Sequence, residues 1–315
     1  MADVTRPLAE GGLGPGGASL HLPPPDPPEG GDVQVTASGW QLAAREFLDN
    51  RLAVVGLLVL VFFVLFCFVG PLVYHTNQVA SNLAASNLKP GHGHPLGTDD
   101  NGFDILGRLM VGGQSSLEIG AAVAVLATSF GVIWGAIAGF TGGFLDAAMM
   151  RIVDVILAVP ALFLLLILAT AVAPSTLELI VVLSFLAWQV PSRLVRGESL
   201  SLRTREFVQA VQVMGGGSAR SVIRHIIPNT VSTIVVNATF QVADAILILA
   251  VLSYLGFGLP PPAATWGGML SDGSSYIFAG YWWQIYPVGI LIVVVVVAFN
   301  FLGDALRDLL DVRLR

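Results

Sequence analysis

The chain has 315 residues, of which 55% are hydrophobic and 11% are charged, with a formal net charge of −6. A soluble domain usually carries about 25% charged residues, so this composition excludes an ordinary soluble domain and indicates a membrane protein. The net charge does not orient such a protein, because orientation follows the placement of Lys and Arg. The single cysteine, Cys67, excludes an internal disulfide and is expected to be a buried, small hydrophobic residue.

The first 38 residues are dense in Pro and Gly and show no hydrophobic period. They predict a disordered tail, with a proline-rich ligand for another protein as the alternative. This stretch also lacks the pattern of a signal peptide. Residues 39–51 predict a short helix at the membrane surface, with Trp40 and Phe47 at the level of the lipid headgroups.

Six apolar segments follow and predict an all-α membrane domain over residues 52–315. The predicted spans are 52–74, 119–139, 155–173, 178–193, 229–252 and 285–303. The segments 75–114 and 254–283 are expected to be outer loops. Gly and Ala recur through the second span, and small residues let membrane helices approach closely. At the start of the third span, Asp154 is expected to pair with Arg151.

A polar stripe runs along the fifth span. Its residues recur every three or four positions and fall within an arc of roughly 80° on a helix. They are Thr230, Thr233, Asn237, Gln241 and Asp244. Polar groups are costly in hydrocarbon, so such a stripe faces protein or a water-filled path. We expect a translocation path lined by Thr233, Asn237, Gln241 and Asp244; a polar seam that bonds a neighbouring helix is the alternative.

Residues 206–229 are the only long polar interruption in the last two-thirds of the chain. Their sequence, EFVQAVQVMGGGSARSVIRHIIPN, predicts two short helices around a glycine elbow at Gly215–Gly217. Thr204 is expected to cap the first helix and Ser218 the second, and Pro228 ends the second or begins the next. The apolar positions are Phe207, Val211 and Met214 in the first helix and Val222, Ile223, Ile226 and Ile227 in the second. Such a loop is a docking surface or a pair of helices resting on lipid headgroups.

The placement of Lys and Arg orients the six spans. An even number of spans puts both termini on one side, and a cytoplasmic assignment places thirteen of the fifteen Lys and Arg there. Lys89 and Arg108 are the two on the outer side. This bias predicts cytoplasmic termini and a cytoplasmic 206–229 loop.

The same loop resembles a known element. Gln209-Ala210-Val211, Gly215 and Ile227-Pro228 have a spacing similar to the EAA loop of ABC-importer permeases, which inserts into a groove on the ATPase subunit. Gln209 stands where that family usually has Glu, and Val211 where it has a second Ala. The resemblance implies a coupling loop over residues 204–228. It assigns ATPase-coupling roles to Glu206, Gln209, Ala210, Gly215, Arg224, His225 and Pro228.

Three further blocks are similar to the C-type permease subunits of dipeptide and oligopeptide ABC importers. They are His94-Pro95-Leu96-Gly97-Thr98-Asp99 with Arg108-Leu109, Ser253-Tyr254-Leu255-Gly256 with Trp266-Gly267, and Asn300-Phe301-Leu302-Gly303-Asp304 with Leu306-Arg307-Asp308. The chain departs from that family at Phe103, Leu249 and Val312, where Arg, Glu and Pro are common. Members of the family also handle nickel complexes and other small solutes, so the substrate stays open.

The resemblance implies the fold of a type I ABC-importer permease in the bacterial inner membrane. It also implies a second, homologous permease of the B type, two ABC ATPase subunits and an extracytoplasmic substrate-binding protein, besides membrane lipid. No nucleic-acid partner is expected. ATP and Mg would belong to the ATPases, and no cofactor is expected in this chain. ATP binding would move the docked loop, tilt the spans and switch access from outside to inside.

No catalytic residues are predicted. The chain has no G-x-x-x-x-G-K-[ST] phosphate loop and shows no set of nucleophile, base and acid. His92 and His94 lie on a loop without further clear ligands, so no metal site is predicted. The alternatives from other classes are a proton-coupled secondary carrier that uses Asp244 and Glu118 and a non-transporting assembly scaffold.

Overall fold

The computed structural model describes residues 47–171 and 174–312, with side chains described as far as Leu310. Within these ranges the chain forms helices, connecting loops and two isolated β-bridges, and no β-strand. The predicted all-α class is confirmed for this part of the chain. The predicted tail, 1–38, and residues 39–46 of the predicted surface helix, 39–51, lie outside the described residues.

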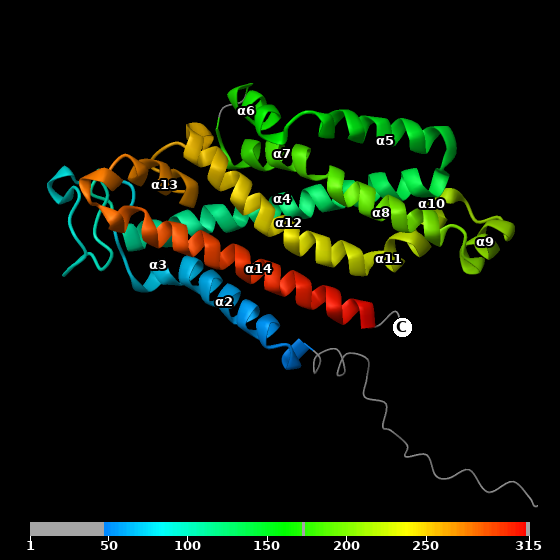
Figure 1. The fold of residues 1–315 in the computed structure, drawn as a ribbon, viewed down its shortest axis with the longest axis horizontal. Helices are drawn as coiled ribbons and strands as arrows, with labels where there is room; N and C mark the ends of the chain where they lie inside the picture. The colour runs from blue at the N-terminus through cyan, green and yellow to red at the C-terminus, as the bar shows by residue number, and fades with distance from the viewer. Residues whose placement is uncertain (1–46, 172–173, 313–315) are drawn as a thin grey trace, which may run out of the picture.

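The helices follow one another along the chain as shown in Figure 1. They are α2 (Arg51–Phe68), α3 (Gly70–Val73), α4 (Ile105–Thr141), α5 (Gly143–Ala158), α6 (Ala161–Ala171), α7 (Thr176–Ala187), α8 (Gln189–Leu202), α9 (Glu206–Val213), α10 (Ser218–Ser221), α11 (Ile227–Asn229), α12 (Val231–Leu252), α13 (Trp266–Ser274) and α14 (Tyr286–Val312). Two π-helical turns, Val222–Ile226 and Ser253–Phe257, and three short 3₁₀ turns, Leu83–Ala85, Ile277–Ala279 and Trp282–Gln284, complete the order.

Six membrane-crossing units are available among the described helices. Four of them, built on α2, α4, α12 and α14, are each long and apolar enough to cross a membrane. The other two are bent pairs, α5 with α6 at 87° and α7 with α8 at 42°. Counting each pair as one span gives the predicted six. The α7–α8 pair continues to Leu202, beyond the predicted limit at residue 193.

The second predicted span starts too late. α4 begins at Ile105 rather than at residue 119, so the first outer loop ends at Asp104 rather than at residue 114. Asp104 caps the helix, because its Oδ1 accepts a hydrogen bond from the backbone N–H of Gly107 at 2.8 Å. Hydropathy missed this first part of the helix because it holds polar residues.

A proline divides the third predicted span. The sequence predicts one helix over 155–173, whereas α5 and α6 meet there at 87°. Pro160 lacks a backbone N–H and disfavours a helical conformation at the residue before it. Val159 accordingly has extended dihedrals, with φ at −89° and ψ at 130°.

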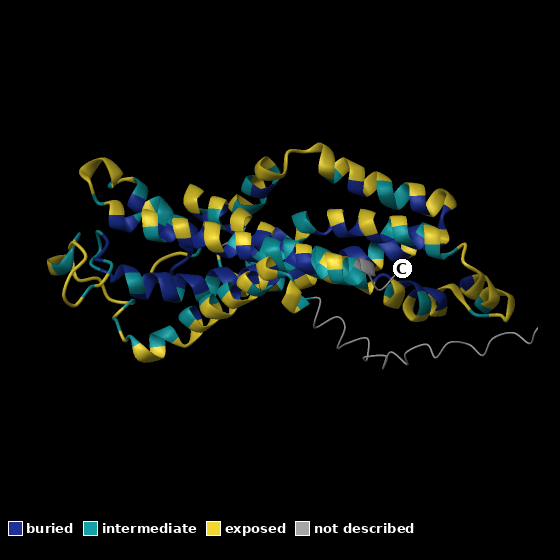
Figure 2. Cartoon of the chain, turned by 60° about the horizontal axis from the view of Figure 1, so that its bottom comes forward, coloured by how far each residue is buried: buried dark blue, intermediate teal, exposed yellow. Residues whose placement is uncertain are grey.

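α4 is the central helix of the bundle. It packs against α7, α8 and α12, and α14 lies between α12 and α2 (Figure 1). Buried residues gather where these helices face one another, as Figure 2 shows. α5 and α6 are only sparsely covered, with Asp146, Val153 and Leu165 buried among their residues.

Glycines allow α4 and α8 to touch at the backbone. A Cβ added at Gly131 would lie 2.6 Å from the backbone oxygen of Trp188, and one at Gly139 would lie 2.6 Å from that of Arg196. A Cβ at Gly135, halfway between, would overlap the backbone oxygen of Ser192. The close approach predicted from the small residues of the second span is confirmed.

Two ion pairs connect α5 to α8. Asp154 pairs with Arg193 at 2.5 Å, so the predicted pair with Arg151 is wrong. Arg196 donates from Nε and Nη2 to the two carboxylate oxygens of Asp146 at 2.5 and 2.7 Å. Both carboxylates of α5 thus pair with arginines of α8, and neither pairs with Arg151 on α5 itself. The bidentate pair fixes orientation as well as distance.

Helix ends and loops pack together at the α13 end of the molecule. Trp266 donates from Nε1 to the backbone oxygen of Leu109 at 3.0 Å, and Trp283 donates to that of Thr98 at 3.2 Å. The Arg108 guanidinium lies 4.3 Å from the centre of the Phe103 ring. Phe103 is the residue that stands where Arg is common in the resembled family. Burial raises the pKa of the Asp99 carboxyl, although backbone N–H donors and Arg108 lower it.

Candidate functional site

The elbow segment, residues 204–228, lies at the end of the molecule opposite α13 (Figure 1). Gly215 has a φ of +80°, the left-handed conformation that favours glycine, and ends α9 as predicted. The N–H of Gly215 donates to the backbone oxygen of Gln212 at 3.0 Å, and the N–H of Gly216 donates to the backbone oxygen of Val211 at 2.8 Å. These bonds satisfy carbonyls that the end of a helix leaves free. The glycine elbow therefore has a defined shape.

Both predicted caps of the elbow segment are wrong. Thr204 donates its hydroxyl to the backbone oxygen of Ser201 at 2.8 Å, closing the turn after α8. Arg205 then occupies the cap position of α9, and Gly217 occupies that of α10, so Ser218 lies inside the helix. Pro228 lies in the first turn of α11, where a missing N–H breaks no helical hydrogen bond.

The elbow segment is anchored on the bundle by apolar side chains. Val208 of α9 and Ile226 of the π-helical turn are fully buried. They belong to a cluster with Val132, Ala136 and Phe140 of α4 and Val195 of α8. Val208 was not among the predicted apolar positions, because an eight-residue helix buries a single residue whose identity depends on its tilt. The cluster makes the elbow segment move with α4 and α8.

The outer surface of the elbow segment carries large apolar side chains. Phe207 is 44% exposed, Met214 is 78% exposed and Val213 is 88% exposed. The predicted coupling residues Glu206, Gln209, Ala210, Gly215, Arg224 and Pro228 are exposed, and His225 is half-buried. Several large apolar side chains exposed together at one tip indicate a surface that another protein covers.

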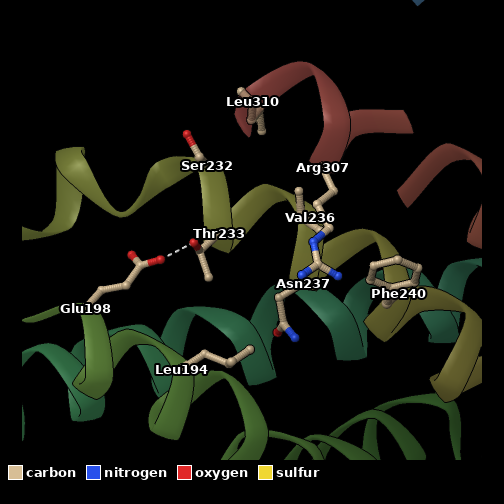
Figure 3. Close-up of a pocket in the computed structure, with 9 residues that line it drawn as sticks. All are labelled: Leu194, Glu198, Ser232, Thr233, Val236, Asn237, Phe240, Arg307 and Leu310. Carbon is tan, nitrogen blue, oxygen red and sulfur yellow. Dashed lines mark hydrogen bonds between the residues drawn. The ribbon is translucent and has the colours of Figure 1, made fainter. Parts of the chain in front are cut away.

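Two residues of the predicted polar stripe line a cavity. Thr233 and Asn237 of α12 face a space of about 390 Å³ toward α8 and α14 (Figure 3). Gln241 lines a different, apolar cavity of about 310 Å³ with residues of α4, α6 and α7. Asp244 is exposed and belongs to neither lining. Thr230, the remaining residue of the stripe, is fully buried. The polar stripe therefore does not line one continuous cavity.

Two charged residues of the first cavity were missed by sequence reasoning. Glu198 of α8 accepts a hydrogen bond from the Thr233 hydroxyl, and Arg307 of α14 points into the same space (Figure 3). Glu198 and Thr233 are 35 positions apart, and no periodicity connects them. The only signal was that Arg307 belongs to one of the motif blocks that resemble peptide-importer permeases.

Comparison with known proteins places the chain in a family. Residues 131–315 match the binding-protein-dependent transport system inner membrane component, and residues 38–90 match the N-terminal transmembrane domain of oligopeptide transport permease C. The chain is 40% identical to the oligopeptide transport system permease protein OppC of Bacillus subtilis over 276 residues, covering 88% of this chain and 90% of that protein.

The chain is a permease subunit of this family. The permease is also 38% identical to OppC of Escherichia coli K12, over 86% of its own length and 90% of that protein. It is 36% identical to the dipeptide transport system permease protein DppC of Bacillus subtilis, over 87% and 86%. The predicted C-type peptide-importer resemblance and the type I permease fold are confirmed.

The family match covers both parts of the candidate site. Residues 131–315 include the elbow segment, all three helices of the cavity and the α4 glycines from Gly131 onward. The permease therefore combines, within one family domain, an anchored elbow at its tip and a polar cavity a few turns away along α12. A displacement of the elbow segment would act on the helices that bound the cavity.

Proposed function

We propose that the permease, with a second homologous permease subunit of the B type, forms the inner-membrane path of an ATP-driven importer for dipeptides and oligopeptides. The substrate class is taken from relatives that are named as oligopeptide and dipeptide permeases. An extracytoplasmic binding protein delivers the peptide, and membrane lipid surrounds the remaining helices. On α12, Thr233, Asn237 and Gln241 contribute to the path, and Asp244 borders it without taking up a proton.

The observation that carries the proposal is the anchored elbow segment with its apolar tip. Val208 and Ile226 attach it to α4 and α8, while Phe207, Val213 and Met214 are exposed. An ATPase subunit that covers this tip would apply its motion directly to the central helix. Two such ATPases would bind ATP and Mg, and closing them would tilt the spans.

The distribution of basic residues supports a cytoplasmic elbow. Arg205, Arg220 and Arg224 are exposed on the elbow segment, whereas Lys89 and Arg108 are the basic residues predicted for the outer side. Membrane proteins retain Lys and Arg on the cytoplasmic side. This orientation places both termini in the cytoplasm and the α13 end, with the packed outer loops, toward the binding protein.

The energy source distinguishes this proposal from a proton-coupled carrier. Cells carrying the permease should take up labelled trialanine, and a background strain lacking it should not. We expect uptake to stop when ATP is depleted and to continue when a protonophore dissipates the proton gradient. Uptake that survives ATP depletion but ends with the proton gradient would support the carrier instead.

Asp244→Asn separates the same two mechanisms at one residue. Asp244 is exposed on α12 and lies outside both cavity linings. We expect trialanine uptake by this variant to stay within about twofold of the wild type, because no proton needs to bind there. The measurement is the initial rate in matched cells with equal amounts of permease in the membrane. Complete loss of uptake in a stably assembled variant would favour proton coupling.

A further inference from the structure

The cavity between α8, α12 and α14 carries charges of both signs at its border. Glu198 is half-buried on α8, and Arg307 is exposed on the last turns of α14. Both side chains border the same space of about 390 Å³, as Figure 3 shows. They reach it from different helices, and Thr233 of α12 lies between them in the view. The cavity is therefore bipolar rather than uniformly acidic or basic.

Polar groups that can bind a peptide backbone lie between the two charges. Ser232, Thr233 and Asn237 line the α12 side of the cavity. The Thr233 hydroxyl already donates to Glu198 and so holds that carboxylate at the cavity wall. The buried Oδ1 of Asn237 has no hydrogen-bond partner among the described residues. Unpaired buried acceptors are costly, and an amide or ammonium donor from a ligand would satisfy this one.

The cavity wall is built by a close helix contact. A Cβ at Gly303 of α14 would lie 2.7 Å from Cε1 of Phe240, whose ring lines the cavity from α12. The glycine lets the two helices pack with the ring between them. Leu194 and Leu310 supply the remaining apolar wall. Small-molecule sites combine an apolar wall with a few polar groups in about 300–1,000 Å³, so this cavity has the size for a short chain only.

We propose that this cavity binds a short zwitterionic peptide on its way to the cytoplasm, an inference that rests on the proposed peptide import. Glu198 holds the terminal ammonium, Arg307 holds the terminal carboxylate, and Asn237 contacts the peptide amide between them. Arg307 suits a carboxylate because its planar guanidinium donates two parallel hydrogen bonds. The site lies toward the elbow end of α12, so peptide would occupy it after crossing most of the membrane.

The experiment pairs each charge with the peptide end that it holds. Cells that carry Glu198→Gln or Arg307→Gln are given three labelled peptides in separate assays. These are trialanine, N-acetyl-trialanine without the terminal ammonium, and trialanine amide without the terminal carboxylate. Each variant rate is divided by the wild-type rate for the same peptide, which removes the preference of the binding protein. Asp308→Asn, an exposed neighbour of Arg307 outside the cavity lining, serves as the control.

We expect Glu198→Gln to lower trialanine uptake about tenfold and to leave the low rate for the N-acetyl peptide unchanged. Arg307→Gln should lower trialanine uptake similarly and spare the amide. The Asp308→Asn rate should equal that of the wild type for all three peptides. In membranes from these cells, ATP hydrolysis stimulated by the binding protein should remain within about twofold of wild type, because the elbow segment is unchanged.

Three results would overturn the inference. The first is equal rates in wild type and both cavity variants, which would leave ATP-driven peptide import intact. The second is a defect of equal size for free and blocked peptides, which would indicate a structural role for the two charges. The third is a defect that vanishes in proteoliposomes lacking phosphatidylethanolamine, which would assign the cavity to a lipid headgroup. If wild-type cells take up no trialanine, the proposed peptide substrate itself fails.

Discussion

Replacing Gly135 with leucine should strongly destabilise the fold of the permease. A Cβ at this position already overlaps the backbone oxygen of Ser192, and backbone cannot turn aside as a side chain can. The larger side chain would force α4 and α8 apart along the contact that includes Gly131 and Gly139. Overpacking a close contact costs about 1–3 kcal/mol, and more where two backbones meet. The melting temperature of the purified protein in detergent should fall by several degrees or more, with aggregation on size exclusion.

Gly197→Leu is the matched control for this substitution. Gly197 lies on α8, the partner of α4 in this contact, but a Cβ there meets no atom within 4 Å. Its leucine variant should melt at or slightly above the wild-type temperature, because glycine is a poor helix former. Equal melting temperatures for the Gly135 and Gly197 variants would show that α4 and α8 do not meet as closely as described.

Gly215→Val should leave the permease folded and stop its transport. Gly215 has a φ of +80°, which a β-branched residue adopts only at a cost of about 1–2 kcal/mol. Nothing lies within 4 Å of an added Cβ, so the effect comes from backbone shape and not from a clash. The elbow would relax to another conformation and present Met214 differently to the ATPase. We expect trialanine uptake to fall at least about tenfold, at an unchanged amount of permease in the membrane.

Gly217→Val provides the control within the same glycine run. Gly217 has a φ of −69° and a ψ of 157°, an extended conformation that valine prefers, and it too has open space around its Cβ position. Its uptake should stay close to that of the wild type. Full uptake by both valine variants would contradict a coupling role for the elbow shape, and loss in both would point to simple exposure of an apolar side chain.

Hydropathy and glycine patterns predicted the features of the permease that depend on local sequence. The six spans follow from apolar length, the α4–α8 contact follows from small residues, and the elbow follows from Gly215, since only glycine adopts its φ without cost. The limits of the spans were less accurate. The bend at Pro160 could have been predicted from the proline itself, whereas the span assignment followed hydropathy alone and treated it as continuous.

The parts that sequence did not predict depend on contacts between distant segments. The hydrogen bond from Thr233 to Glu198 and the position of Arg307 exist only because α8 and α14 lie on the same side of α12. The helical periodicity of the polar stripe was predicted correctly. The helices packed around α12 nevertheless separate its residues, so Gln241 faces a different cavity from Thr233 and Asn237. The cap at Thr204 failed because the turn after α8 uses the Thr204 hydroxyl, and the cap at Ser218 failed because α10 already begins at that residue.

Photo-crosslinking from the two ends of the permease tests whether the elbow segment docks on an ATP-binding subunit. A photoreactive amino acid replaces either Met214, which is 78% exposed on the elbow segment, or Phe278, which is 100% exposed in the turn after α13. Position 214 should crosslink to an ATP-binding subunit, identified by mass spectrometry, and position 278 should not. Crosslinking of the ATPase from position 278, or of the extracytoplasmic binding protein from position 214, would contradict this docking.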